Sequence, residues 1–423
     1  MIKLFTNSSP IVSIIILLLL FFCLPVESQS MDRIEVDGQQ LFLNGGNIAW
    51  INFAEDIGPG ETRLSLFEEI FREVNEHGGN TLRMWLHTTG ENTPAWHGHR
   101  VTGPGEGTIN DLRAILDLAY EYNIGLMLCL WSFDMLRISN GPEITERALA
   151  ILTDEEKTNL YIESALIPMV NSLRGHPAIL AWEIFNEPEG MSFEFGWEFT
   201  KHIPMYHIQK FINLTAGAIR RTDPDVKITN GIWSFFALSE KAPTPEEPPG
   251  ARRYSGGLTL TELEVLKNYL SEKYEQDFSI EETTEYYDTY QDFGERKNYY
   301  SDEELINAGG DEDGYLDFYT VHYYTWGGTE ISPFHHDFDS WELDKPTVVA
   351  EFYLDKTFGL EPDDLYKVLY ERGYAGALGW QWYDHWRQRE GISHNWPIAL
   401  RNMRTIFELY PGDVKLEFQS ELP

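Results

Sequence analysis

The chain has few cysteines and few basic residues. Only two of its 423 residues are cysteine, and 32 lysines and arginines stand against 68 aspartates and glutamates, which gives a formal net charge of −36. A surface this acidic repels nucleic acid and anionic membranes, and it favours a substrate without charge. Cys23 precedes the folded part, so no internal disulfide is expected, and Cys129 in an apolar run is predicted to be a buried, inert thiol.

Long hydrophobic runs are also scarce. The one candidate, Ile11–Leu24, follows Lys3 and ends at Pro25. At about 14 residues it is shorter than the roughly 20 of a membrane-spanning helix. Its layout is typical of a secretory signal peptide, so we predict that residues 1–28 are removed and that 29–423 form a single catalytic domain. The protein is expected to be secreted, or periplasmic if its source is bacterial, without a stable membrane anchor and as a monomer.

Short apolar segments alternate with amphipathic ones along the rest of the chain, and this alternation is typical of a parallel sheet with covering helices. Eight such units predict an α/β fold, a (β/α)₈ TIM barrel. The predicted strands are Gly45–Ile51, Thr81–Leu86, Ile124–Trp131, Ile179–Phe185, Lys227–Trp233, Leu316–Val321, Thr347–Ala350 and Gly376–Gln381. The predicted helices are Ser65–His77, Leu112–Tyr122 after a cap at Asn110-Asp111, Thr153–Leu173 with a capping box at Thr153, Pro204–Arg220, Glu361–Arg372 and Pro397–Leu409.

Two segments depart from this pattern. Asp32–Asn44 reads as a hairpin that turns at Asp37-Gly38 and closes the bottom of the barrel. A long acidic insertion, about 237–308, separates the fifth and sixth strands, with a helical stretch at Leu258–Leu270. We favour a solvated excursion for the insertion over a cleft wall or lid that presents its tyrosines to substrate. Those tyrosines are Tyr286, Tyr287 and Tyr290.

Two glutamates end predicted strands. Glu187 follows the fourth strand and Glu351 follows the seventh. Side chains at the carboxyl ends of barrel strands face the catalytic mouth. A pair of carboxyl groups there is what glycoside hydrolysis needs, one as acid/base and the other as nucleophile. We therefore predict Glu187 and Glu351 as the catalytic residues.

Other strand-end residues are candidates for binding substrate or supporting the carboxylates. Asn186 can donate to a sugar 2-hydroxyl, and Arg83 and Tyr324 can keep Glu351 ionised. His322 shares the face of Tyr324 by the alternation of a strand. Trp380 is a candidate floor beneath the reacting sugar, with Trp382 and Trp131 as alternatives.

Other chemistries have little support. His97-Gly-His99 has the residue types of a metal site, but it lies in a Gly/Pro-rich loop well past the second strand. No glycine-rich phosphate loop or nucleophilic-serine elbow occurs in the sequence. We expect neither a metal nor a cofactor.

The site pattern resembles the catalytic signature of glycoside hydrolase family 5, a family of retaining (β/α)₈ enzymes. The resemblance runs from about Leu41 to Gln381. Several stretches are similar to secreted endo-β-1,4-mannanases of animal type within that family. These stretches are Thr81-Leu-Arg-Met-Trp-Leu-His87, Gly175-His-Pro-Ala, Trp182-Glu-Ile-Phe-Asn-Glu-Pro-Glu-Gly190, Tyr299-Tyr-Ser-Asp, Ala308-Gly-Gly and Gly373-Tyr-Ala-Gly-Ala-Leu-Gly-Trp380.

The resemblance implies Glu187 as acid/base, Glu351 as nucleophile and retention of configuration. In these roles Glu187 is expected to have a raised pKa and Glu351 a depressed pKa. Many family members carry a histidine at the end of the third strand, where this chain has Leu130-Trp131-Ser132, and His87 is a partial substitute from the second strand. The predicted substrate is a neutral polysaccharide, foremost β-1,4-mannan. Endo-glucanase action, exo-mannosidase action and a catalytically silent carbohydrate-binding barrel stay open as alternatives.

Overall fold

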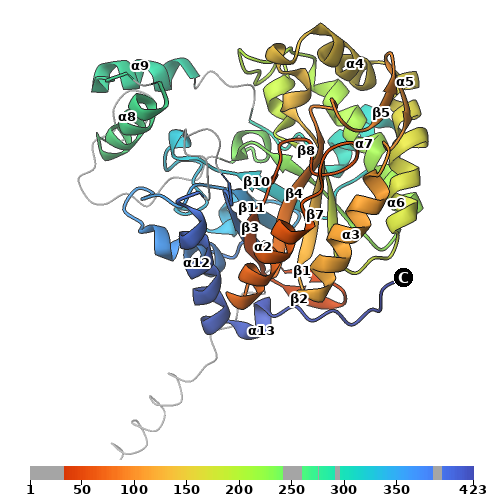
Figure 1. Cartoon of the computed structure of the whole chain (residues 1–423). Coiled ribbons are helices and arrows are strands. Elements are labelled where there is room, and N and C mark those ends of the chain that lie inside the picture. The colour runs from red at the N-terminus through yellow and green to blue at the C-terminus, as the bar shows by residue number, and fades with distance from the viewer. Residues whose placement is uncertain (1–32, 242–259, 275, 291–295, 384–392) are drawn as a thin grey trace, which may run out of the picture. The chain divides into compact units, whose positions relative to one another are not determined.

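A closed barrel of eight parallel strands forms the centre of the molecule (Figure 1). The computed structural model describes residues 33–241, 260–274, 276–290, 296–383 and 393–423. Around the barrel the strands follow the order β10-β11-β12-β3-β4-β7-β8-β9. Their bounds are β3 Leu43–Asn47, β4 Thr81–Thr88, β7 Gly125–Ser132, β8 Ile179–Asn186, β9 Lys227–Ile232, β10 Tyr319–His322, β11 Thr347–Glu351 and β12 Gly376–Gly379. Each overlaps one predicted strand, so the (β/α)₈ prediction is confirmed.

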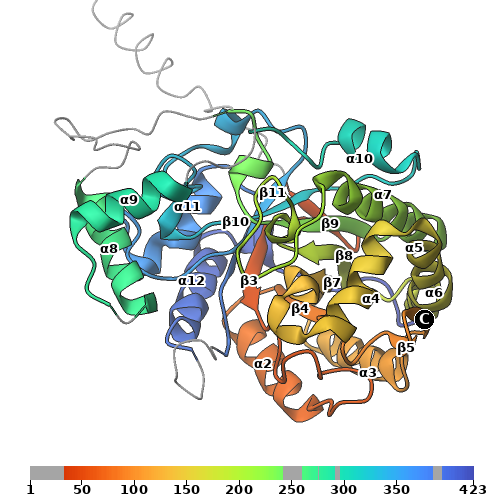
Figure 2. The same ribbon diagram turned by 90° about the horizontal axis from the view of Figure 1, so that it is seen from above.

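Helices surround the strands, as the view from above shows (Figure 2). Buried faces such as that of α2, with Phe67, Ile70, Phe71 and Val74, explain why these segments pack onto the sheet. The helices are α2 Leu64–Glu76, α3 Thr108–Glu121, α4 Pro142–Thr153, α5 Glu155–Tyr161, α6 Ile167–Leu173, α7 Met205–Thr222, α8 Leu260–Tyr274, α9 Ile280–Tyr290, α10 Asp302–Gly309, α11 Leu365–Glu371, α12 Trp396–Leu409 and α13 Pro411–Val414.

Two predicted helix starts are wrong. α3 begins at Thr108, so Asn110 and Asp111 lie in its first turn and do not cap it. Thr153 ends α4, and the side chain of Asp154 caps α5 by accepting from the amide of Glu156. Both errors have the same cause, because several neighbouring polar residues could serve as a cap and only the local backbone selects one.

The bottom of the barrel is closed as predicted. β1 (Ile34–Val36) and β2 (Gln39–Leu41) pair through a turn at Asp37 and Gly38, whose φ angles of 47° and 76° are typical of a tight hairpin turn. Apolar side chains of this hairpin join the starts of the barrel strands in one core cluster. Its members include Ile34, Val36, Leu41, Leu43, Met127, Leu180, Val348 and Leu416.

The insertion between β9 and β10 contains helices α8, α9 and α10. The helix predicted at Leu258–Leu270 corresponds to α8, while α9 was not predicted. Leu263, Leu266 and Leu270 of α8 form a small apolar cluster, against which Tyr286 and Trp326 pack. The side chains of Tyr287 and Tyr290 lie outside the described residues, so the choice between a solvated excursion and a cleft wall stays a prediction.

The surroundings of two single residues bear on their chemistry. Cys129 is free and buried, and burial raises the pKa of its thiol. Asn213, in the sequon Asn213-Leu-Thr215, has no exposed surface, and its amide donates to the backbone oxygens of Asp311 and Gly314. A glycan on that nitrogen is therefore incompatible with this fold.

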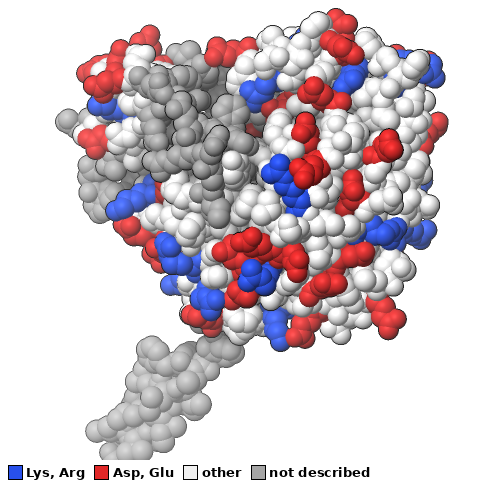
Figure 3. Space-filling view, viewed as in Figure 1, with Lys and Arg blue, Asp and Glu red and all other residues white. Residues whose placement is uncertain are grey.

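Surface charge and helix length are the next two features of the described residues. Acidic side chains spread over the described part of the face in Figure 3, with basic side chains between them. In the described part of the chain, every helix is too short or too polar to cross a membrane. The segment predicted as a signal peptide lies outside the described residues.

Candidate active site

The two predicted catalytic glutamates meet at the carboxyl ends of their strands. Glu351 is the last residue of β11, and Glu187 directly follows β8. The amide of Glu187 donates to the carbonyl of Gly231 at 2.7 Å, and its φ of 47° turns the chain sharply. An oxygen of one carboxyl group lies within 4.8 Å of an oxygen of the other. Retaining glycosidases place their carboxyl groups about 5–5.5 Å apart, and inverting ones about 6.5–9.5 Å.

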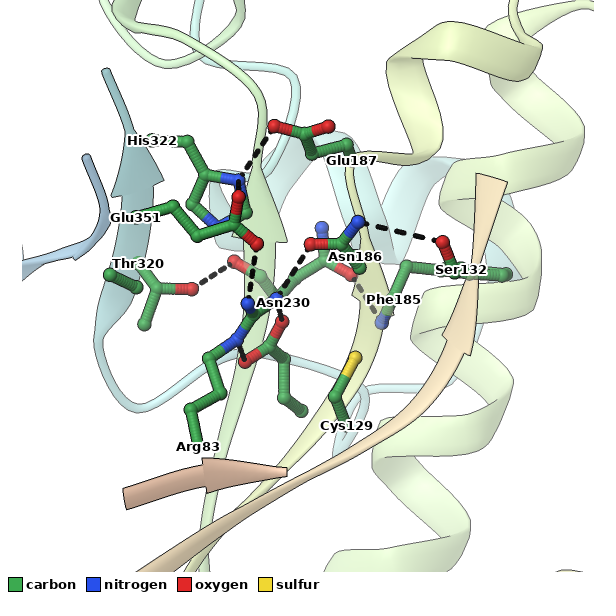
Figure 4. A network of polar contacts seen from close by, with 12 residues as sticks. Arg83, Cys129, Ser132, Phe185, Asn186, Glu187, Asn230, Thr320, His322 and Glu351 are labelled. Atoms are coloured by element: carbon green, nitrogen blue, oxygen red, sulfur yellow. Dashed lines mark hydrogen bonds and ion pairs between the residues drawn. The ribbon is translucent and has the colours of Figure 1, made fainter. Parts of the chain in front are cut away.

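His322, at the end of β10, lies between the two carboxyl groups (Figure 4). Its Nδ1 is 2.8 Å from Oε1 of Glu187 and 3.6 Å from Oε2 of Glu351. Burial, and next the charge of Arg83, lower the pKa of His322 well below its usual value. A neutral ring that is protonated on Nδ1 can donate to Glu187 without adding a charge to the site.

Glu351 has a cation and a hydroxyl as partners. Nη1 of Arg83 donates to its Oε1 at 2.6 Å, and the hydroxyl of Tyr324 donates to its Oε2 at 2.7 Å. Both bonds favour the ionised form of this carboxyl group. The predicted setting of Arg83 and Tyr324 around Glu351 is therefore present in the structure.

Arg83 is held by more partners than the sequence suggested. It forms a two-pronged pair with Glu183, at 2.7 Å from Nε and 2.6 Å from Nη2. It also donates to the side-chain oxygens of Asn186 at 2.7 Å and Asn47 at 3.1 Å. Glu183 and Asn47 were missed by sequence reasoning. The available signal was a glutamate in the middle of an apolar strand, which is costly unless it is paired.

The pKa values differ in part from the prediction. Burial, reinforced by Glu351, raises the pKa of Glu187 well above its usual value, as expected for an acid/base. Burial also raises the pKa of Glu351, to about 7, although Arg83 and Tyr324 act in the opposite direction and lower it. The expected depression of the Glu351 pKa is wrong, because removal from water outweighs its partners in the unliganded site. The two carboxyl groups still differ in their partners. Glu351 accepts from the cationic Arg83 and from Tyr324, while Glu187 has the neutral His322.

An aromatic cluster lies beside Arg83 and Tyr324, the two partners of Glu351. Trp380 packs on Trp50 and Trp85, with ring centroids 5.7 and 5.6 Å away, and Tyr353 packs on the same cluster. Trp382 follows two residues later and is half-buried, with its amide bonded to the carbonyl of Asn47. The flat faces of such rings suit stacking on sugars.

Two predicted contact residues are buried near the carboxyl ends of β4 and β7. His87 has no exposed surface and is bonded through Nδ1 to Thr93, and burial lowers its pKa to about 3. Trp131 packs on His87 and on Tyr161, with centroids 4.8 and 5.3 Å away, and is likewise fully buried. Both side chains are packed in the core of this structure, so we omit them from the proposed contacts, including the expected role of His87 in place of the strand-three histidine.

A metal is not favoured at the carboxylates. Glu187, His322 and Glu351 have the ligand types for one, but both oxygens of Glu351 are already engaged by Arg83 and Tyr324. His97 and His99 are exposed at the hairpin of β5 (Ala95–His97) and β6 (Arg100–Gly103), and they belong to no candidate metal cluster among the described residues.

Comparisons with known proteins agree with this geometry. No family model matches the chain. A mannan endo-1,4-β-mannosidase of Mytilus edulis is 30% identical over 393 residues, which cover 87% of this chain and 91% of that protein. The chain belongs to this mannanase family. A second mannan endo-1,4-β-mannosidase, of Cryptopygus antarcticus, is 30% identical over 371 residues, 81% of each chain. The predicted resemblance is thereby confirmed.

Solved structures lead to the same family. The β-mannanase of Mytilus edulis superposes with a TM-score of 0.68 at 28% identity and covers 91% of this chain and 99% of that one. The β-1,4-mannanase of Aplysia kurodai gives 0.69 at 27% identity, over 90% and 97% of the two chains. As a member of this family, the chain is a glycoside hydrolase of the animal mannanase type.

Proposed function

We propose that this chain hydrolyses β-1,4-linked mannan from within the polymer, by double displacement with retention of configuration. The observation that carries the proposal is the pair of carboxyl groups, with an oxygen of Glu187 within 4.8 Å of an oxygen of Glu351. The names of the relatives support the substrate, since both curated proteins are mannan endo-1,4-β-mannosidases.

In the first step, an oxygen of Glu351 attacks the anomeric carbon and the glycosidic C–O bond breaks. Glu187 gives its proton to the leaving oxygen, so the shortened chain departs as an alcohol. Arg83 and Tyr324 hold Glu351 in place through its two oxygens. Arg83 also accounts for the orientation of Asn186, because it donates to Oδ1 of that side chain. One N–H of the Asn186 amide points to Ser132 at 3.5 Å, and the other is left for a sugar hydroxyl.

In the second step, Glu187, now ionised, takes a proton from water. The resulting hydroxide attacks the anomeric carbon and breaks the bond to Glu351, which leaves as a carboxylate. Two inversions at one carbon retain its configuration. His322 orients Glu187 in both steps, because its Nδ1 can donate to Oε1 of that carboxyl group at 2.8 Å and leaves Oε2 to give and regain the proton.

The sugar contacts are part of the same proposal. We assign Trp380 as the floor of the site and Trp382 as a neighbouring stacking surface, because both follow β12 beside the carboxylates. We further propose that residues 1–28 are a signal peptide and that the remainder is one secreted barrel domain. Sequencing the amino terminus of the secreted protein tests this, with a start near Gln29 expected.

Two isosteric variants test the catalytic assignment. We expect Glu187→Gln and Glu351→Gln each to lower turnover on mannan by several orders of magnitude, while Glu198→Gln, an exposed glutamate of the loop after β8, keeps wild-type turnover. Near-normal turnover in either variant would overturn the assignment. The product profile on mannan, cellulose and short mannooligosaccharides tests the substrate. A ladder of mannooligosaccharides is expected, and release of monosaccharide alone would contradict endo action.

A further inference from the structure

A second glutamate follows the acid/base at a distance of two residues. Glu189 belongs to the short turn Pro188–Met191 and has no exposed surface. Among the residues that the structure describes, no cation pairs with it. A carboxyl group buried without a counter-ion is costly, and such groups occur where the chemistry requires them.

The carboxyl group of Glu189 joins three parts of the chain. Its Oε1 accepts from the hydroxyl of Tyr300 at 2.5 Å, and its Oε2 accepts from the amide of Trp233, just beyond β9, at 3.2 Å. Tyr300 is itself fixed, because it is fully buried and its amide donates to Asn298 at 3.0 Å. The turn after β8 is thus bonded to the end of β9 and to the chain segment before α10.

This turn carries strained backbone. Glu187 has φ and ψ of 47° and 52°, a left-handed conformation that residues with a side chain rarely adopt. Such a conformation persists only where the surroundings enforce it. The backbone contacts of Glu187 are to Gly231 at 2.7 Å and from Gly190 at 3.2 Å, so the side-chain bonds of Glu189 add two further anchors.

We propose that Glu189 is a positioning residue for Glu187: its carboxyl group fastens the turn that carries the acid/base to Tyr300 and to the end of β9. The inference rests on the proposed catalytic role of Glu187. It assigns no contact between Glu189 and the substrate.

The charge of Glu189 acts in the same direction as this positioning. After burial, Glu351 and then Glu189 raise the pKa of Glu187, Arg83 lowers it, and Asp134 raises it. Burial raises the pKa of Glu189 to about 7, while the bonds from Tyr300 and Trp233 lower it and so favour its ionised form. Removal of the negative charge of Glu189 therefore lowers the pKa of Glu187.

The experiment compares two substrates and the pH dependence of kcat/KM. Mannan needs a protonated acid for its leaving group, whereas an aryl β-mannobioside with a dinitrophenolate leaving group does not. For Glu189→Gln we expect kcat/KM on mannan to fall about tenfold, a part of the factor that general acid catalysis contributes. On the aryl substrate the loss stays within about threefold, and the alkaline limb of the mannan profile moves to lower pH. Tyr300→Phe shifts the limb in the same direction by less.

Glu198→Gln, the same substitution at an exposed position of the same loop, is the matched control and retains wild-type profiles. Equal losses on both substrates, or an alkaline limb that coincides with the wild type, would overturn the inference. Tyr300→Phe decides the question if Glu189→Gln does not fold, because it removes only one hydroxyl. Glu187→Gln separates the inference from the proposed function. Normal turnover of Glu187→Gln would refute the proposed function. If Glu187→Gln is inactive and Glu189→Gln behaves as the wild type, only the inference about Glu189 is refuted.

Discussion

Replacing Arg83 by lysine tests how much the barrel depends on its buried charge network. Arg83 donates five hydrogen bonds, to Asn47, Asn186, Glu351 and twice to Glu183. A lysine ammonium group has three donors at one point and cannot reproduce the fork. At least two of these bonds are therefore lost while their acceptors stay buried.

The magnitude follows from that count. A hydrogen bond to a charged group contributes about 1.5–3 kcal/mol, so two lost bonds correspond to about 3–6 kcal/mol of unfolding free energy. Arg72→Lys is the matched control, because Arg72 is exposed and has one i,i+4 partner, Glu76, at 3.5 Å. Its effect should stay within about 0.5 kcal/mol.

Chemical denaturation and the acid limb of the activity profile report the outcome. Arg83 lowers the pKa of Glu351, and the reaction needs Glu351 ionised, so losing the arginine contact raises that pKa. The acid limb of kcat/KM in Arg83→Lys should then move to higher pH. The reasoning would be refuted if the unfolding free energy of Arg83→Lys stayed within about 1 kcal/mol of the wild-type value and the acid limb of kcat/KM did not move. The network would then affect neither the stability of the barrel nor the pKa of Glu351.

Three further predictions concern the core and the surface. Gly231→Ala should lower the unfolding free energy by about 1–3 kcal/mol and reduce kcat, because its Cβ would lie 2.3 Å from Oε1 of Glu183 and 2.8 Å from the carbonyl of Phe185. Gly412→Ala, where the added carbon meets nothing, is its control in the same denaturation assay. Because burial lowers the folded-state pKa of His87 to about 3, the unfolded chain binds its proton first, and stability should decline from about pH 6.5 downward with a slope of up to about 1.4 kcal/mol per pH unit from this group. His87→Phe should lack that part of the slope in denaturation measured between about pH 4 and 7, and an equal slope in both proteins would contradict the burial argument. Peptide mapping of protein secreted by a glycosylating host should find Asn213 unmodified, and a glycan there in folded, active protein would contradict the bonds of its amide to Asp311 and Gly314.

The strands and the meeting of Glu187 and Glu351 at the ends of β8 and β11 could be predicted from sequence, because both depend on simple local patterns. Each barrel strand is a short apolar run, and a glutamate at the end of such a run has one place to point. Helix starts were less predictable, as α3 and α5 illustrate, since the cap is selected by backbone geometry among adjacent polar residues.

The remainder of the site depends on distances across the barrel. Glu183 and Arg83 are 100 positions apart in sequence yet form a two-pronged pair, and no local pattern contains that contact. His87 looked like a mouth residue because its strand was expected to end at Leu86. β4 continues to Thr88, and this longer strand places His87 in the core beside Trp131 and Tyr161.

Both ends of the described chain are fastened to the face of the barrel opposite the glutamates. Asp37 in the β1–β2 turn accepts from the backbone amide of Ser420, and Arg33 donates to Asp413 at 2.8 Å. An attachment made at the carboxyl-terminal tail would therefore leave the mouth of the barrel unobstructed. If the enzyme were immobilised on a solid support through that tail, the mouth of the barrel would face the solution. A large polysaccharide could then reach it without passing between the protein and the support.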